Sequence, residues 1–568
     1  MQLDRARVSA GTTRTSLRTV ARGVWACGVV CLLISGSMPA AAAAPAAKSP
    51  VSRPALRTDL GPHHMTITTA SALAQQYFDQ GLRWTYAFNH AEAIRSFQEA
   101  LRHDPGASMA YWGIAYALGP NINALMSAAQ ERQAVQAVKR AKAGAKRLTV
   151  RERDYIAALA YRYSDEVNDH RARLDRTYAD AMRVLATKYP GDLDAATLFA
   201  EALMDLTPWD YWTREGEPRR YTAEIVATLE RVLKSHPDHP GACHFYIHAV
   251  EASQHPERAV PCAERLPSLM PGAGHLVHMP AHVFMRVGRY ADAVERNLHG
   301  AHVDEDYIRD RGAGSTYVAS YYPHNLHFLW AALVMEGRSR EAGSAASRLA
   351  KASPSSAIKD APELELFPVT PLLQLVRFGQ WETVLNEPVP PAHLRYTDGL
   401  RHFARGLAFL RTHRLEQADE ERRLLGIAID EMPPSRLVGM NAARALLDLA
   451  AHVLVAELAA ERGLDELAVR ELEEAVAIED GLVYDEPPAW LLPVRQSAGA
   501  ILLRLGRAAE AELMYREDLV RYPNNGWSLF GLAQALAAQG KKEEVAAVER
   551  RFRTAWARAD VTLTGSRF

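Results

Sequence analysis

The chain has 568 residues, of which 48% are hydrophobic and 23% are charged. This composition is typical of a folded protein and excludes a wholly disordered, collagen-like or mucin-like chain. The 66 Lys and Arg residues balance the 67 Asp and Glu residues to a net charge of −1, so no basic excess supports nucleic-acid binding as the main function.

Residues 1–44 have the pattern of an export signal. Arginines precede an apolar stretch at 23–35, and small residues at 40–44 offer cleavage sites. The stretch is shorter than the ~20 residues that a membrane helix needs, although an uncleaved anchor is the alternative. We therefore expect an exported protein, periplasmic or secreted, without a membrane span after cleavage. A Pro/Ala-rich linker follows at 45–70, and we expect 45–62 to be disordered.

Signal cleavage would leave two cysteines, Cys243 and Cys262. An oxidising compartment would allow them to pair, because we expect them on neighbouring antiparallel helices. The alternative is two separate buried thiols. Neither lies in a CxxC or zinc-ribbon spacing, so we assign them no redox chemistry.

From residue 71 onward, apolar and Ala-rich segments recur with helical spacing. A landmark of Gly followed five residues later by Ala or Val returns along the chain, at Gly288/Ala293, Gly337/Ala342, Gly379/Val384, Gly506/Ala511 and Gly540/Val545. The steps from Ala259 to Ala293 and from Ala511 to Val545 are both 34 residues, the period of the tetratricopeptide (TPR) repeat. The first unit has the TPR ladder as well, with Gly81, Trp84, Ala93, Phe97, Ala100 and Pro105.

These features predict an all-α chain of helix-turn-helix repeats that forms a right-handed superhelix. We expect an N-terminal array at 71–240, His-rich units at 241–345 and a C-terminal array at 346–568. An aromatic insertion at 207–221 and a second insertion at 304–322 interrupt the period. Insertions in repeat arrays usually lie on one face, often the binding face, although they can also be simple surface spacers.

Histidine is concentrated in the middle of the chain, where 10 of the 21 histidines lie between His244 and His327. Seven of them fall at offsets of 18, 15 or 11 residues before the landmark Ala of three consecutive repeats: His244, His248, His275, His278, His282, His324 and His327. These offsets differ by three, four and seven, so the seven side chains share one stripe of the first helix in each hairpin.

Imidazoles at i and i+4 can chelate one ion, and stacked helices bring the same column within reach of a neighbour. A single helical histidine is usually structural, but three repeats in register favour a shared transition-metal site. Imidazole ligands without thiolates suit Zn, Cu or Fe. Glu251 lies one turn after His248 and is the carboxylate that we add to the site.

Further candidate groove residues are weaker predictions. Glu201 and Asp205 lie on the preceding first helix, Arg286 follows His282 by one turn, and Tyr321 precedes the last histidine pair. Asp304 opens the second insertion and could tune the site. Each of these has an ordinary interpretation as a solvated polar side chain.

Several strings together resemble a group of exported bacterial TPR-repeat proteins: NHAEA at 89–93, AYWGIA at 110–115, PWDYW at 208–212, HPGACHFYIH at 239–248, GHLVHMPAH at 274–282, EPPAW at 486–490 and PNNGW at 523–527. The resemblance covers nearly all of the chain after the leader and implies the fold and export, but no reaction. It also implies that the histidine stripe lines the concave groove.

The sequence supports two functions. In the first, the groove holds a multi-histidine metal site for metal binding or metal-dependent chemistry; whether that makes the protein an enzyme stays open. In the second, a metal-free TPR scaffold binds a peptide or protein partner there. A peptide, a protein or a small molecule could occupy the groove, and the sequence does not determine the oligomeric state.

Overall fold

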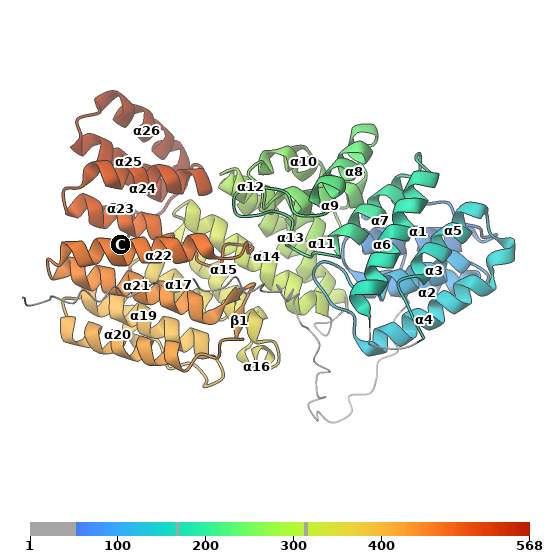
Figure 1. The fold of residues 1–568 in the computed structure, drawn as a ribbon, viewed down its shortest axis with the longest axis horizontal. Helices are drawn as coiled ribbons and strands as arrows, with labels where there is room; N and C mark the ends of the chain where they lie inside the picture. Colours follow the sequence, from blue (N-terminus) through green and yellow to red (C-terminus); the bar gives the residue numbers. More distant parts are fainter. Residues whose placement is uncertain (1–52, 166–169, 312–315) are drawn as a thin grey trace, which may run out of the picture.

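The computed structural model describes residues 53–165, 170–311 and 316–568 (Figure 1). The predicted export signal and the start of the linker lie outside these residues. Within them the chain is a succession of antiparallel helices, and its strands are the two-residue hairpin β1 (Leu437–Val438) and β2 (Asn441–Ala442). The predicted all-α helix-turn-helix array is confirmed.

Helices α1–α8 form one end of an elongated molecule (Figure 1). Their bounds are α1 Ala72–Tyr86, α2 His90–His103, α3 Ser108–Ala117, α4 Ala128–Ala143, α5 Val150–Ala160, α6 Arg171–Lys188, α7 Leu193–Met204 and α8 Thr222–Ser235, with the 3₁₀ helix η1 at Ala145–Arg147. Side chains cap several N-termini; the Thr149 hydroxyl and the Glu152 carboxylate of α5, for example, form a capping box.

The middle of the molecule contains α9 Pro240–Val250, η2 Pro256–Ala259, α10 Val260–Leu269, α11 Gly274–His278, α12 Pro280–Arg286, α13 Tyr290–Arg311, α14 Thr316–Met335, α15 Ser339–Ala352, α16 Ser355–Ile358, η3 Pro362–Leu366, α17 Thr370–Arg377 and α18 Trp381–Asn386. The predicted insertion at 304–322 falls on the end of α13 and the start of α14, which are longer than the other helices of their hairpins.

The far end is built from α19 Arg395–Arg411, α20 Leu415–Asp430, α21 Ala443–Glu461, α22 Asp465–Gly481, α23 Val494–Arg504, α24 Ala508–Arg521, α25 Gly526–Ala538 and α26 Lys542–Ala555. This end also packs back onto the middle of the chain. The Trp527 indole donates to the Val334 carbonyl at 2.9 Å, and Arg377 donates to Gln496 at 2.7 Å. Contacts between distant repeats therefore add to those between neighbours.

The landmark residues define the hairpin turns as predicted. All five landmark glycines have left-handed backbone, with φ between 63° and 74°. Only glycine adopts this conformation without steric strain. The landmark residues Ala293, Ala342, Val384 and Ala511 are fully buried where the two helices of each hairpin meet.

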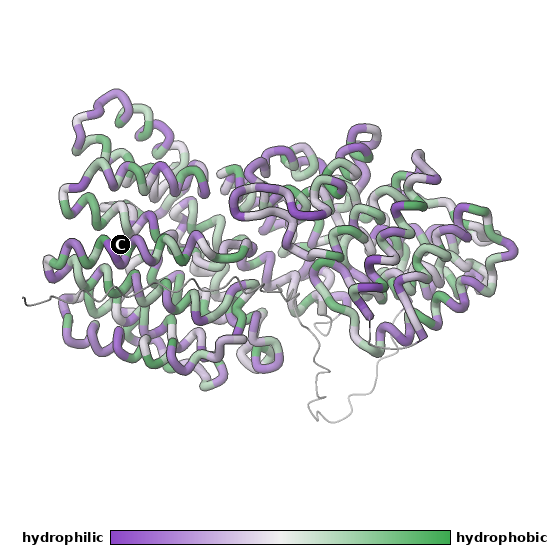
Figure 2. The backbone as a smooth tube through the Cα atoms, viewed as in Figure 1, coloured by the Kyte–Doolittle hydropathy of each residue, from purple (hydrophilic) through white to green (hydrophobic). Residues whose placement is uncertain are grey.

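Hydrophilic and hydrophobic residues alternate along most helices, as expected for helices with one buried face (Figure 2). Among the described helices, none is both long and apolar enough to cross a bilayer.

The expectation of disorder is wrong for the described part of the linker. Leu60 and Met65 are buried, with exposed fractions of 0% and 2%. The Arg57 amide donates to the Gln80 side chain at 2.8 Å, and the Met65 amide donates to Asp79 at 3.2 Å. The segment packs because it carries spaced apolar side chains and finds acceptors on α1, which its proline content does not reveal.

Close helix packing in the first repeat depends on two glycines around one aromatic ring. A Cβ atom at Gly81 would lie 2.5 Å from the Phe97 ring, and one at Gly113 would lie 2.6 Å from it. The same arrangement recurs near the C-terminus, where Gly499 and Gly531 flank the Tyr515 ring. The ring is thus held between two helix backbones that only glycine allows to approach.

We expect Gly81→Ala to lower the free energy of unfolding by about 1–3 kcal/mol, because the added methyl group overpacks the Phe97 ring. Gly426→Ala is the matched control, since nothing lies within 4 Å of a Cβ at that helical position. It should gain about 0.5–1 kcal/mol from helix propensity. Urea denaturation measures both, and equal effects of the two substitutions would contradict the packing argument.

Candidate metal centre

Six of the seven predicted histidines come together in two groups of three. The first cluster consists of His244 and His248 from α9 and His275 from α11; the second consists of His278 at the end of α11, His282 from α12 and His324 from α14. In each group the three candidate ligand atoms lie within 4.8 Å of one another. Each cluster therefore takes the 15 and 11 offsets of one repeat and the 18 offset of the next.

This rule explains why His327 lies apart. It has the 15 offset of the third repeat, but Ala331 occupies the 11 offset, and the following repeat has Leu366 at the 18 offset. The His327 ring stacks on Trp330 with an interplanar angle of 3°, and its Nδ1 atom has no hydrogen-bond partner among the described residues.

The ring nitrogens of each cluster converge through their Nε2 atoms. In the first cluster, His244 Nε2 lies 3.1 Å from His275 Nε2 and 3.1 Å from His248 Nε2. In the second, His282 Nε2 lies 2.8 Å from His278 Nε2 and 3.3 Å from His324 Nε2. Nitrogen ligands around a tetrahedral ion with bonds of ~2.0–2.1 Å are about 3.3 Å apart, so both clusters have the spacing of a metal site.

The opposite ring nitrogens are held by acceptors. His244 Nδ1 donates to the Tyr86 carbonyl at 2.7 Å, and His278 Nδ1 donates to the Asn297 side-chain oxygen at 2.6 Å. His248 Nδ1 donates to Glu251 at 2.7 Å. A proton on Nδ1 leaves Nε2 with a lone pair, which is how second-shell acceptors prepare histidines for metals.

The lone pairs of His244 Nε2 and His248 Nε2 consequently face each other at 3.1 Å without a proton between them. Burial, the largest cause, lowers the pKa of His248 to about 3, and it lowers the pKa of His244 as well. Both rings are therefore neutral at physiological pH. Two acceptors in contact repel each other unless a cation lies between them.

Glu251 connects the two clusters. One of its oxygens accepts from His248, and the other accepts from His282 Nδ1 at 2.7 Å. Glu486, on the loop between α22 and α23, lies 2.7 Å from the same His282 nitrogen. Although burial alone lowers it, these two carboxylates raise the pKa of His282 to about 10. Without metal the second cluster holds a proton, which an ion would displace.

The clusters are adjacent as well as similar. The ring centroids of His248 and His282 lie 5.6 Å apart, and those of His275 and His278 lie 6.0 Å apart. Five of the six side chains are at most 3% exposed, and His324 is half-buried. The expected open groove is therefore wrong at this point, because the chain on either side closes over the histidines.

Other predicted residues support the clusters rather than join them. Arg286 donates to the carbonyls of Glu251 and Ser253 at 3.0 and 3.1 Å. The Tyr321 ring lies edge-on to His275, with centroids 4.6 Å apart. Gly274, at the start of α11, has no room for a side chain, because a Cβ would lie 2.0 Å from the Asp304 carboxylate.

Glu201 and Asp205 belong to a separate buried ionic network. Tyr116 donates to Glu201 at 2.7 Å, and the Arg162 guanidinium pairs with Asp205 and with Asp175. Neither carboxylate belongs to a histidine cluster. Their charges are compensated inside α5–α7, so these two residues stabilise the fold.

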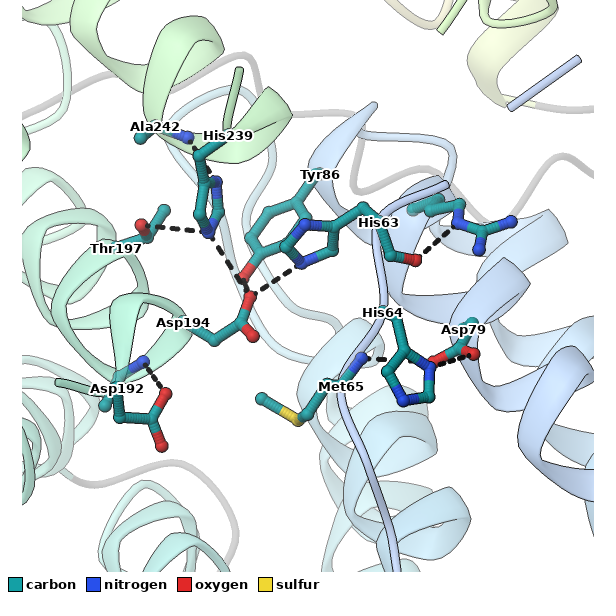
Figure 3. A network of polar contacts seen from close by, with 12 residues as sticks. His63, His64, Met65, Asp79, Tyr86, Asp192, Asp194, Thr197, His239 and Ala242 are labelled. Atoms are coloured by element: carbon teal, nitrogen blue, oxygen red, sulfur yellow. Dashed lines mark hydrogen bonds and ion pairs between the residues drawn. The ribbon is translucent and has the colours of Figure 1, made fainter. Parts of the chain in front are cut away.

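A third group joins the N-terminal segment to α7 and α9 (Figure 3). The Asp194 carboxylate accepts from His63 at 2.9 Å and from Tyr86 at 2.6 Å, and His239 Nε2 lies 3.4 Å away. His239 Nδ1 accepts from the Ala242 amide, so its proton lies on Nε2 and points to Asp194. The nitrogens of His239 are thus already used. This network fixes Tyr86, whose carbonyl orients His244.

Two aromatic residues next to the first cluster have strained backbone. Phe88 and Trp209 have φ values of 56° and 62°, which bulky residues rarely adopt. The Phe88 ring lies 4.6 Å from the His244 ring, and the Trp209 ring lies 5.1 Å from the His248 ring. Strain of this kind is concentrated at functional sites.

Sequence reasoning missed Phe88, Trp209 and Glu486 as neighbours of the clusters. Phe88 precedes the first conspicuous string, Trp209 lies in the aromatic insertion, and Glu486 begins EPPAW. The strings stood out by composition, but nothing in their spacing relates them to the histidine columns.

Of the two readings of the cysteines, the structure has free thiols. Cys243 and Cys262 are both buried. A hydrogen bond with Cys262 and burial raise the pKa of Cys243.

No protein-family model and no curated protein matches this chain. Solved structures match at low similarity. A human IFIT1 dimer with m7Gppp-AAAA is 14% identical over 75% of this chain and 87% of its own, with a TM-score of 0.31. The APC/C hetero-tetramer Cut9-Hcn1 is 13% identical over 82% and 76%, with a TM-score of 0.32. The TPR domain of P58(IPK) is 12% identical over 83% and 99%, with a TM-score of 0.22. We carry no ligand or partner from them to this chain.

Asp304 provides a pH test of the packing below α11. It is 2% exposed and accepts from Tyr317 at 3.0 Å, while the Tyr317 oxygen accepts from the His275 amide at 3.0 Å. Burial raises the pKa of Asp304 to about 7. Because its unfolded pKa is about 3.9, the folded state binds the proton more tightly, and this stabilisation is lost as pH rises through 7.

We expect Asp304→Asn, which stays neutral, to gain stability relative to the wild type between pH 5 and pH 8, on the order of 3 kcal/mol. Urea midpoints of both proteins at the two pH values measure the difference, in which other titrating groups cancel. A constant difference would show that Asp304 is ionised across this range.

Proposed function

We propose that this protein is an exported helical-repeat protein that binds two transition-metal ions in neighbouring three-histidine sites, for metal binding or metal-dependent chemistry. The observation that carries the proposal is the pair of Nε2 lone pairs of His244 and His248, 3.1 Å apart in a buried cluster with no proton between them. The Arg-rich leader at 1–44 supports export.

The donor set narrows the choice of metal. Each cluster offers three neutral imidazole nitrogens and no thiolate, which suits Zn, Cu or Fe. Iron(II) sites of this size usually add a carboxylate ligand, whereas Glu251 faces the Nδ1 side of its histidines. Copper and zinc therefore fit better than iron. Three protein ligands leave a fourth position for water or substrate, as in catalytic zinc sites.

The alternative function is a metal-free scaffold that binds a peptide or protein at the same stripe. Peptide recognition requires accessible side chains, and His244 and His278 are 0% and 1% exposed. The burial of the histidines favours an ion over a peptide as their ligand. A scaffold function of the helical array would use another surface.

Elemental analysis of the untagged protein tests the proposal. We expect up to two equivalents of Cu or Zn in the wild type and at most one in His278→Ala/His282→Ala, which removes two of the three ligands of the second cluster. His255→Ala is the matched control, because that side chain is exposed and pairs with Glu257. It should keep the full metal content.

Helical circular dichroism must be unchanged in the double variant for the comparison to hold. Absence of metal from the wild type after reconstitution with Cu(II) and Zn(II) would overturn the proposal. Peptide binding that is unchanged by EDTA would then favour the scaffold.

We expect Glu251→Gln to weaken metal binding by about 10- to 100-fold, because the amide cannot accept fully from both His248 and His282. Competition with a chromophoric chelator measures the dissociation constants. Glu257→Gln, on the exposed turn that follows, is the control and should leave them unchanged. Unchanged affinity in Glu251→Gln would show that the carboxylate only packs between the rings.

A further inference from the structure

A cavity of about 140 Å³ adjoins both histidine clusters. His248 and His275 of the first cluster and His282 and His324 of the second form part of its wall, whereas His244 and His278 do not line it. The fourth coordination position of each ion would therefore open toward the same space.

The rest of the wall comes from segments that are distant in sequence. Its apolar part is made by Trp209, Tyr321, Leu364, Phe367 and Met440. An apolar cavity of about 150 Å³ in another protein binds one benzene molecule. The volume thus suits a single six-membered ring, and three aromatic rings with a thioether offer it edge and face contacts.

Two features of the wall show that its shape is built for a ligand. Trp209 keeps a strained φ of 62°, and its indole nitrogen donates to the Ile122 carbonyl at 3.0 Å, which fixes the ring. The Tyr321 hydroxyl accepts from the Asn123 side chain at 3.1 Å. Both aromatic walls are thereby held in one orientation without metal or ligand.

Charge selects among ring compounds. Asp485 and Glu486 line the cavity, and the described residues of its wall include neither Lys nor Arg. A ring with a carboxylate would meet two acidic side chains and no basic partner. A neutral ring with a hydroxyl group can donate to a carboxyl oxygen and offer its own oxygen to a metal.

We propose that this cavity binds one neutral monocyclic phenol, with its ring between Trp209, Tyr321 and Phe367 and its oxygen at the open positions of the two clusters. This inference rests on the proposed function, because the metal ions supply the partner of the phenol oxygen. It names a substrate class for that site, namely small phenols rather than peptides or anions.

Isothermal titration of the metal-loaded protein with phenol tests the proposal, with benzoate and cyclohexanol as probes of charge and aromaticity. We expect saturable binding of one phenol per chain and at least tenfold weaker binding of the other two. The metal-free protein should bind phenol at least tenfold more weakly as well. Tighter binding of benzoate than of phenol would overturn the charge argument and the proposal.

Ala124→Phe places a ring in the cavity without changing a histidine, and we expect a loss of phenol affinity of at least tenfold at unchanged metal content. Ala129→Phe, the same substitution at an exposed position of α4, should bind phenol as the wild type does. If Ala124→Phe does not fold, Leu364→Trp fills the cavity from the opposite segment and has the same expected result.

Metal retention distinguishes the two proposals. A wild type with full metal content and no saturable phenol binding would overturn the phenol assignment and leave the metal site in place. A wild type that takes up no metal would overturn both. Equal phenol affinity in the wild type and in both filled variants would place the binding elsewhere and overturn the assignment to this cavity.

Discussion

The centre of this molecule depends on one electrostatic constraint: imidazole nitrogens that carry lone pairs face each other in a dry interior. His244 and His248 each have their Nδ1 proton engaged by an acceptor, so neither can donate to the other across 3.1 Å. A buried polar contact of this kind is unfavourable by itself. It becomes favourable when a cation occupies the space between the nitrogens.

The surrounding structure maintains this arrangement. The Asp194 network fixes Tyr86, and the carbonyl of Tyr86 in turn orients His244 (Figure 3). Glu251 holds one ring from each cluster and is itself positioned through its carbonyl by Arg286. The protein therefore fixes the ring orientations at a distance from the ligand atoms, which is what a preorganised metal site requires.

Closure of the site comes from parts of the chain that lie far apart. The return of the C-terminal helices onto the middle brings the Glu486 loop to His282. The N-terminal segment and Phe88 cover the other side, at the expense of a strained backbone. The superhelix is thus folded back on itself here, and the histidines lie in a closed interior with one small cavity beside them.

The sequence by itself determined the helical period, the glycine turns and the shared face of the seven histidines, because all of these follow from local backbone geometry. It could not separate the seven into two clusters, exclude His327 or add Glu486. Those outcomes depend on how consecutive helices stack and on where a distant loop returns. A period of 3.6 residues fixes the direction of a side chain on its own helix, but only tertiary packing fixes the distance between side chains on different helices.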